Sequence, residues 1–365
     1  MSLSQVSMDD TTPVYLVTDN AQFDNSVDAS SEVVTSESSS ARSMSTLSSR
    51  EFASYFKTLH GFTYVTDDNI PLAFPTDAVA ERVDAVFNMI TRLCQGGKNI
   101  PSIADELLAK GGLDGKGARV LSLVTNSGVW AYEMASTYRD ARFVSIDVKP
   151  LTELVPHERI KFEVYDIYAG IAGPDAGFDL VHARQCVTME KCPHKATEAC
   201  EIALQPFFVS YRSSITASDP AVPLRTSPMR AEAIDLMRKA HIAQGIDLAA
   251  WDDMSCRLDP GHPMWNNNNI DIKNTTSPIR GFRTITTFTY LIPNGPWPGE
   301  ERERAIGAMA KLIFEKVWKA LPPMLRMMGM EESVASAFLA RLEAEVQDQR
   351  FRSYAKYKLW CARKI

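Results

Sequence analysis

The sequence predicts an α/β protein built on a doubly wound parallel sheet. From Arg119 onward, short apolar runs alternate with helical stretches, which is typical of a parallel sheet covered by helices on both faces. The run 119–123 ends in a turn of small residues that opens a helix, as nucleotide-binding strand–loop–helix units do. Hydrophobic residues make up 45% and charged residues 23% of the 365, enough for a sizeable core.

The N-terminal segment 1–48 is expected to be a disordered, serine-rich tail. Residues 26–49 contain eleven serines and almost no large apolar side chains, so folding them would bury too little surface to offset chain entropy. The serines are candidates for phosphorylation, although a solvated segment without a specific role is the simpler interpretation. The apolar scatter Val14 to Val17 suggests a short docking strand.

Two helices are expected before the sheet begins. Apolar residues recur at helical spacing from Val79 to Cys94, and Thr76 or Asp77 is available as the N-cap. Ser102 followed by Asp105 predicts a capping box at the start of a second helix over 102–110.

The sheet region follows, and its periodicity places both kinds of element. Strands are predicted at 119–123, 142–147, 160–165, 178–183 and 207–213, and helices at 128–138, 194–204 and 228–243. Residues 252–281 are expected to form a long irregular insert, of the kind that often serves as a lid or binding loop.

The C-terminal part is predicted to add one strand, two helices and a closing strand. Arg283 to Ile292 is rich in Thr, Phe and Tyr, and the helices 301–320 and 331–347 are separated by Pro322-Pro323. Tyr354 to Cys361 alternates aromatic and basic residues and is predicted to be an edge strand. The expected domain therefore spans 49–365, with a core at 111–220, an insert or lid at 220–350 and a closing strand at 352–364.

Charge and hydropathy exclude several classes of partner. The formal charge of −6 does not favour nucleic-acid binding, and no apolar run is long enough to span a membrane. The first ten residues lack the basic and apolar regions of a signal peptide. We therefore expect an intracellular protein, cytoplasmic or nuclear, with reduced cysteines.

Four segments are expected to meet at the carboxyl ends of the strands, where open α/β sheets bind ligands. They are the loop Val124 to Gly128, Asp147 nineteen residues beyond Gly128, Asp166 after the third strand, and the fourth strand 178–184. A carboxylate at position 147 suits the two hydroxyls of a ribose, and one at position 166 is placed to accept from an adenine amino group.

In their order and spacing these segments resemble the class I S-adenosylmethionine (SAM)-dependent methyltransferases. More narrowly, the chain resembles the fungal group related to regulators of secondary metabolism, often called LaeA-like. The resemblance covers about residues 55–364 and rests on Pro75-Thr-Asp, Glu81-Arg-Val-Asp84, Gly96-Gly-Lys98, Trp130 to Ala135, Ile146-Asp147, Phe162 to Asp166, Phe178 to Arg184, Gly295-Pro-Trp-Pro298 and Ala362-Arg-Lys364.

The resemblance implies a Rossmann-like seven-stranded fold with N-terminal helices and a C-terminal helical, substrate-covering region. It also implies SAM as cofactor and a small molecule or a protein side chain as methyl acceptor. The implied cofactor-binding residues are Val124, Thr125, Asn126, Gly128, Asp147 and Asp166.

The chain departs from the family pattern in places that bear on activity. The family's first motif has glycine where Val124 and Asn126 stand, and an aspartate where Ser122 stands. A β-branched residue is costly at positive φ, and its bulk would project where a cofactor approaches the backbone. Phe207-Phe208 replaces a Pro-Gly-Gly turn. These departures motivate an alternative, a pseudo-methyltransferase that acts as a regulatory binding protein with a protein partner.

No catalytic residue stands out. His182 in the fourth strand and His262 in the long insert are candidate general bases, and a structural role is the competing interpretation for each. Cys186, Cys192, His194 and Cys200 match no standard zinc spacing, so no metal site is predicted.

Overall fold

The structure is a computed structural model. It describes residues 14–17, 45–46, 49–67, 75–151, 155–164, 177–184, 208–214, 227–246, 254–265, 280–348 and 352–365. For 14–17, 45–46, 49 and 208–214 it describes the backbone alone.

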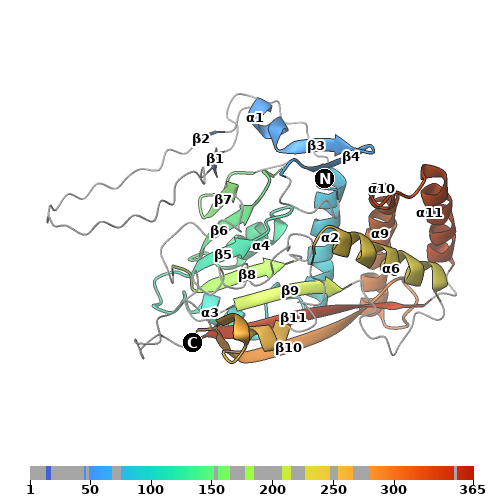
Figure 1. The fold of residues 1–365 in the computed structure, drawn as a ribbon. Helices are drawn as coiled ribbons and strands as arrows, with labels where there is room; N and C mark the ends of the chain where they lie inside the picture. Colours follow the sequence, from blue (N-terminus) through green and yellow to red (C-terminus); the bar gives the residue numbers. More distant parts are fainter. Residues whose placement is uncertain are drawn as a thin grey trace.

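A single large sheet organises the molecule. Its nine strands run in the order β10-β11-β9-β8-β5-β6-β7-β1-β2 (Figure 1). Strands β5 to β9 pair in parallel, whereas β10 and β11 pair antiparallel to each other and β11 pairs antiparallel to β9. The predicted α/β class with a parallel sheet is therefore confirmed.

The five parallel strands lie close to their predicted positions. For β5 to β8 this agreement arises because each strand is a largely apolar run buried on both faces, which local sequence reveals. Their bounds are β5 Arg119–Leu123, β6 Arg142–Asp147, β7 Ile160–Val164, β8 Leu180–Arg184 and β9 Phe208–Ser214.

Helices α2 and α3 directly precede the parallel strands β5 to β9 in the chain. Helix α2 spans Ala78–Cys94, and the Asp77 side chain caps it by accepting hydrogen bonds from the amides of Val79 and Ala80. Helix α3 spans Ser102–Ala109, but its N-cap is Pro101 and makes no side-chain capping bond. The predicted Ser102 capping box is thus wrong, because the Asp105 carboxylate instead accepts from Lys98 and Tyr138.

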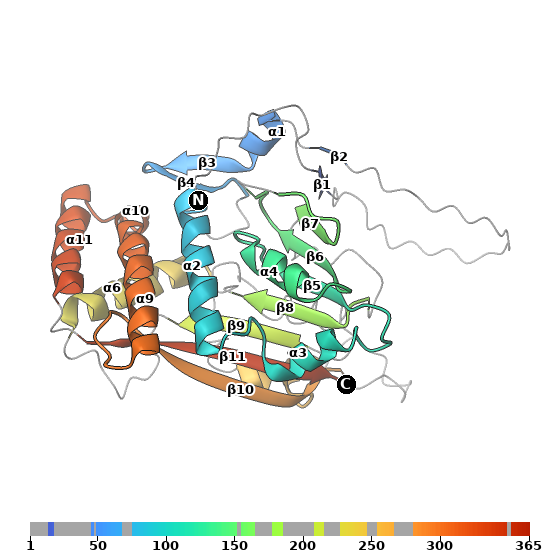
Figure 2. The same ribbon diagram turned by 180° about the vertical axis from the view of Figure 1, so that it is seen from behind.

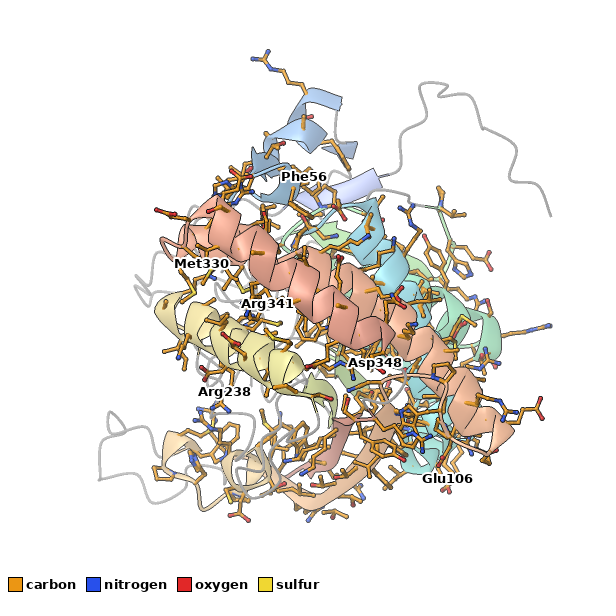
Figure 3. The ribbon with its side chains drawn as sticks, turned by 90° about the vertical axis from the view of Figure 1, so that its right-hand side faces the viewer. Phe56, Glu106, Arg238, Met330, Arg341 and Asp348 are labelled. Atoms are coloured by element: carbon orange, nitrogen blue, oxygen red, sulfur yellow. The ribbon has the colours of Figure 1, made fainter. Side chains whose placement is uncertain are left out.

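The remaining helices gather mainly at one end of the strands. Helix α4 (Val129–Thr137) follows β5, and Figure 1 shows α6 (Pro228–Ala243), α9 (Glu301–Lys319), α10 (Leu321–Met327) and α11 (Glu332–Gln347) beyond the carboxyl ends of β8 and β9. Figure 3 shows α11, between Met330 and Asp348, lying next to α6. The carboxylate of Glu345 on α11 accepts from the amides of Met229 and Arg230, which satisfies two open N–H groups at the start of α6.

In the C-terminal half, one prediction is confirmed with an addition and another is wrong. Pro322 and Pro323 lie between helices α9 and α11, as predicted, and they occupy the first turn of an additional helix, α10, where a missing N–H costs nothing. Strand β11 (Tyr354–Lys364) is not an edge strand: it lies between β9 and β10, and β10 (Phe282–Pro293) forms the edge. Seen from behind, in Figure 2, the long β10–β11 pair runs along the bottom of the sheet.

The insert 252–281 is described only in part. It contains a short helix α8 (Met254–Leu258) and a 3-10 turn at Pro263–Trp265, and the Ser255 hydroxyl lies 3.1 Å from that of Thr287 on β10. The predicted helix 194–204 lies outside the described residues.

The N-terminal segment supplies small elements. Strand β1 (Val14–Val17), at the position suggested for a docking strand, pairs in parallel with β7 and antiparallel with β2 (Ser45–Thr46). Helix α1 (Ser49–Ser54) leads into a separate hairpin of β3 (Phe56–Leu59) and β4 (Phe62–Val65).

The core lies on both faces of the sheet. On one face, buried residues of α2, α3 and α4 pack with those of α9, α10 and α11, and a second cluster joins the other side chains of β5, β6 and β8 to α8. Among the helices in the described ranges, none combines the length and apolar character needed to cross a bilayer.

Candidate functional site

The candidate site is the loop that follows β5, at the carboxyl end of a central strand. Val124, Asn126 and Gly128 all have positive φ, at 61°, 52° and 74°. The loop therefore keeps a left-handed backbone at two positions where glycine is absent. Such a conformation costs a non-glycine residue roughly 1–2 kcal/mol, so the surrounding contacts must hold it.

Those contacts tie the loop to the end of β6. The amide of Thr125 donates to the Ile146 carbonyl at 3.1 Å, and the amide of Asn126 donates to Oδ2 of Asp147 at 2.9 Å. The Thr125 and Ser145 hydroxyls lie 2.9 Å apart. These hydrogen bonds fix the loop relative to the end of β6.

Asp147 is the central acidic group of this site. Its side chain is buried, and besides Asn126 its carboxylate accepts from the amide of Val148 at 2.8 Å. Burial raises the pKa of the Asp147 carboxyl above its usual value, while the positive charge of Lys149 and the amide donors oppose that rise. A carboxylate can accept about four hydrogen bonds, so Asp147 retains capacity for hydroxyl donors of a ligand.

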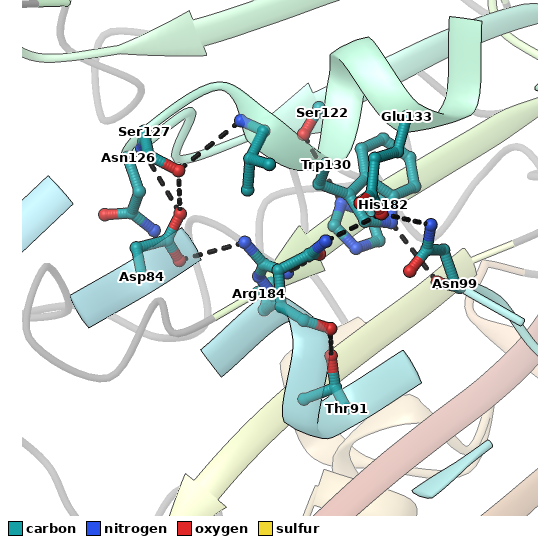
Figure 4. A network of polar contacts seen from close by, with 12 residues as sticks. Asp84, Thr91, Asn99, Ser122, Asn126, Ser127, Trp130, Glu133, His182 and Arg184 are labelled. Atoms are coloured by element: carbon teal, nitrogen blue, oxygen red, sulfur yellow. Dashed lines mark hydrogen bonds and ion pairs between the residues drawn. The ribbon is translucent and has the colours of Figure 1, made fainter. Parts of the chain in front are cut away.

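Helix α2 approaches the loop from the other side. Asp84 accepts from the Ser127 hydroxyl at 2.5 Å and from the Ser127 amide at 3.3 Å. Its other oxygen accepts from Nη2 of Arg184, the last residue of β8, at 2.9 Å. Both charged side chains are buried. One carboxylate therefore joins α2, the loop and the end of β8, as Figure 4 shows.

The network extends along α2 to α4. Nη1 of Arg184 donates to Oδ1 of Asn88, and the Asn88 amide nitrogen donates to Glu133 at 2.8 Å. Asn99 donates to the same Glu133 oxygen at 2.6 Å, and Arg92 makes an ion pair with Glu133 at 3.6 Å. Glu133 therefore bridges α2 and α4.

His182 lies beneath the loop rather than at an open surface. Its ring stacks on the indole of Trp130, with centroids 3.5 Å apart, and Nδ1 lies 3.3 Å from the Ser122 hydroxyl. Burial, with a smaller contribution from Arg184, holds the pKa of the imidazole well below its usual value. A buried, neutral, stacked ring fits a structural role.

The second candidate base lies far from the loop along the sheet. His262 is two residues from Pro260, which packs against Gly281 at the start of β10. Phe282, the next residue, pairs with Lys364, at the amino ends of the parallel strands. The structure thus places His262 towards the amino ends of the parallel strands, whereas the candidate loop follows the carboxyl end of β5.

Other predicted site residues cannot be placed. Asp166 and Phe207 lie outside the described residues, as do Cys186, Cys192, His194 and Cys200. The described ranges contain no group of three or more His, Cys, Asp or Glu side chains that would hold a metal ion.

Sequence reasoning did not identify Asp84, Asn88, Arg184 and Lys149 as site residues. A signal was present on α2, since Glu81, Asp84 and Asn88 stand at helical spacing on a face with buried neighbours such as Phe87. A polar stripe on the buried side of an otherwise amphipathic helix indicates buried polar partners.

No protein-family model matches the chain. Two sequence relatives are fungal methyltransferases. Methyltransferase str3 of Strobilurus tenacellus is 31% identical over 110 residues, covering 30% of this chain and 36% of the relative. Methyltransferase pytC of Aspergillus terreus is 23% identical over 249 residues, which cover 66% of each chain.

Among solved structures, the phosphoethanolamine N-methyltransferase 2 of Haemonchus contortus in complex with S-adenosyl-L-methionine matches with a TM-score of 0.34. It is 13% identical, with 80% of this chain and 61% of that chain covered. A geranyl diphosphate methyltransferase, solved in complex with geranyl diphosphate and sinefungin, matches with a TM-score of 0.33. It is 8% identical, with 72% of this chain and 76% of that chain covered. The relatives of this chain are thus methyltransferases, which agrees with the class of activity that the sequence predicts, and this chain spans about a third to two thirds of the length of its sequence relatives.

Proposed function

We propose that this protein is a class I SAM-dependent methyltransferase that acts on a small-molecule acceptor. The observation that carries the proposal is the loop Val124 to Gly128 at the carboxyl end of β5. It has a left-handed backbone at three positions and a direct bond from the Asn126 amide to Asp147. That geometry suits a cofactor that approaches the loop backbone while the acidic residue of the next strand holds its ribose.

A buried polar atom of the loop, without a hydrogen-bond partner among the described residues, supports a ligand-binding site here. The Asn126 side-chain nitrogen is buried and has no hydrogen-bond partner among the described residues. Since buried donors are normally paired, this amide is available to an acceptor atom on the cofactor.

The protein's own part in the reaction would be to bind and align. Asp147 would accept the ribose hydroxyls, Asp166 would accept from the adenine amino group, and the backbone of 124–128, with Thr125 and Gly128, would line the methionyl part. When bound, SAM supplies an electrophilic methyl group, and transfer requires an acceptor nucleophile held in line with it. His182, which lies beneath the loop, is buried and is not placed to act as a general base. We therefore propose that catalysis rests chiefly on proximity and alignment.

The finer assignment is also a proposal. The motifs shared with the LaeA-like group favour a place beside the fungal enzymes of secondary metabolism, and both sequence relatives come from fungi.

The decisive experiment is calorimetric titration of the full chain with SAM and with its product S-adenosylhomocysteine (SAH). We expect micromolar binding of both. Asp147→Ala should abolish it, because the variant loses the acceptor of the ribose hydroxyls. The matched control is Asp235→Ala, which removes an exposed carboxylate on α6 that pairs with its neighbour Lys239.

Each other outcome has a definite meaning. Absence of binding to a folded wild-type sample would refute the proposal and favour the alternative, a regulatory binding protein. Unchanged SAM and SAH affinity in Asp147→Ala would show that Asp147 does not bind the cofactor. If the protein binds SAM, methyl transfer from labelled SAM to small molecules of a fungal extract would then identify the acceptor class.

A further inference from the structure

A buried ammonium group lies two residues beyond Asp147. The Lys149 side chain is only 7% exposed, and its Nζ makes no hydrogen bond with any residue in the described part of the chain. Its charge partner is Glu81 of α2, whose Oε1 lies 3.6 Å away, beyond ordinary hydrogen-bond distance. Lysine is rarely buried without paired donors, because losing hydration is costly. The three N–H groups of Lys149 therefore call for an acceptor that none of the described residues supplies.

The charges around Lys149 limit what that ligand can be. Asp147 is close enough for the ammonium charge to lower the pKa of its carboxyl, and Glu81 adds a second carboxylate. The trio of Glu81, Lys149 and Asp147 thus carries an excess of one negative charge. A phosphate placed here would meet this excess in a buried setting, where repulsion is weakly screened. A neutral acceptor atom would meet no such penalty.

A ribose hydroxyl has the complementary chemistry. Each hydroxyl can donate its proton to a carboxylate and accept a hydrogen bond on the same oxygen. A ribose beside Asp147 would therefore present acceptor lone pairs to a neighbouring ammonium.

We propose that Lys149, held by Glu81, donates a hydrogen bond to a ribose oxygen of the bound cofactor and makes the site selective for an unphosphorylated adenosyl group. This inference rests on the proposed function, since it assigns a second polar contact to the same ribose. Glu81 is a positioning residue here, because it acts on the ligand only through Lys149.

The first test compares SAH affinity in wild type and Lys149→Met by calorimetry. A charge-assisted hydrogen bond to a buried group is worth about 10- to 100-fold in affinity, so we expect a loss of that size. Glu81→Gln should cause a smaller loss, because the ammonium is retained but less firmly held. The matched control is Lys311→Met on α9, which removes an ion pair of similar length, 3.8 Å to Glu315, and should leave affinity unchanged.

Discrimination between nucleosides is a measurement that a purely structural role of Lys149 would leave unchanged. Wild type should bind adenosine more tightly than 2′-deoxyadenosine or 3′-deoxyadenosine, and in Lys149→Met the difference for the contacted hydroxyl should shrink. Thermal unfolding of each variant shows whether it is folded. Lys149→Gln provides a second neutral variant should the methionine variant fail to fold.

The wild-type protein alone tests the selectivity. Adenosine 2′-monophosphate should bind at least about tenfold more weakly than adenosine at low salt, because of the local negative excess. Equal or tighter binding of the phosphate would overturn the proposal and make Lys149 a phosphate-binding residue. Unchanged SAH affinity in both neutral variants would overturn it while leaving the proposed function intact. If wild type binds neither SAH nor adenosine, the proposed function fails and this inference fails with it.

Discussion

Val124 adopts a conformation that β-branched residues rarely take. Its φ is 61°, yet its side chain is 7% exposed and packs in the apolar cluster with Leu123, Ile146 and Val148. Contacts within the protein itself hold this strained backbone. Strain held in this way is common to the free and bound states and cancels in the binding free energy, so it does not by itself weaken cofactor binding.

We therefore expect Val124→Gly to change SAH affinity by less than about tenfold, or 1.4 kcal/mol. The intrusion of a valine side chain into the cofactor would instead predict a larger gain on removing it. Calorimetry decides between the two. Gly128→Ala provides the control for a distorted loop, since an added Cβ at φ 74° would lie 3.2 Å from Leu151 and 3.3 Å from Tyr132. That variant should lose affinity and stability together.

Individual site residues were predictable only where the backbone determines their role. Asp147 follows an apolar strand, and its bond to the Asn126 amide follows from the strand–loop–helix pattern. Arg184 and Lys149 obtain their partners from α2, which lies far away in sequence. Local sequence contains no information on such pairs, because the partner depends on how the helix packs over the sheet.

At the scale of elements, α2 is joined to the sheet by a buried ion pair. Asp84 and Arg184 come from α2 and β8, and each is almost fully shielded from solvent. Removing one partner of a buried pair leaves the other charge uncompensated, at a typical cost of 3–5 kcal/mol. Hydrogen bonds from Ser127 and to Asn88 add further partners that would also be lost.

We expect Asp84→Asn and Arg184→Met each to lower the unfolding free energy by about 3–5 kcal/mol. The double variant should cost less than the sum of the two, with a coupling of about 1–3 kcal/mol. Urea denaturation of the four proteins measures this cycle. The exposed pair Asp235 and Lys239 on α6 is the matched comparison, with a coupling of about 0.5 kcal/mol or less. Additive effects of Asp84 and Arg184 would show that the ion pair is not what attaches α2.

The positions of helices and strands along the chain were predicted better than the way in which they pair and pack. The strands from 119 to 184 and helix α6 have bounds that periodicity reveals, because burial on one or both faces is recorded in the local pattern. The place of β11 between β9 and β10 was not predictable in this way, since it depends on pairing with residues up to 154 positions away, as for Ala362 with Phe208. Helix α10 was missed for a different reason: Pro322 and Pro323 indicate a helix break, but proline is also accepted in the first turn of a new helix.

At the scale of the whole molecule, buried histidines make stability depend on pH. Burial lowers the pKa of both His182 and His241 in the folded state below the ordinary value of 6.5. Below pH 6.5 these two imidazoles are therefore more fully protonated in the unfolded chain than in the folded protein. The stability contributed by these neutral histidines is present above pH 6.5 and is lost as pH falls.

We expect the unfolding free energy to drop by up to about 1 kcal/mol for His182 between pH 6.5 and 5.5, with a further drop from His241. Burial also raises the folded pKa of Asp147, so protonation of its carboxyl favours the folded state as pH falls and partly offsets this loss. Urea denaturation at pH 7.5, 6.5 and 5.5 measures the slope. In His182→Phe the ring stacked on Trp130 is kept but cannot be protonated, so the slope should decrease. An identical slope in that variant would contradict the assignment to His182.

The position of β11 also has a consequence for how the protein is made. Residues 354–364 fill the gap between β9 and β10, with Tyr357, Leu359 and Trp360 almost fully buried. A nascent chain still lacking this stretch holds two strands with open edges, and open edges invite pairing with other chains. The sheet can close only after the ribosome has released Lys364 from its exit tunnel. Any message interrupted before codon 354 therefore yields a polypeptide prone to aggregation rather than a shorter working protein.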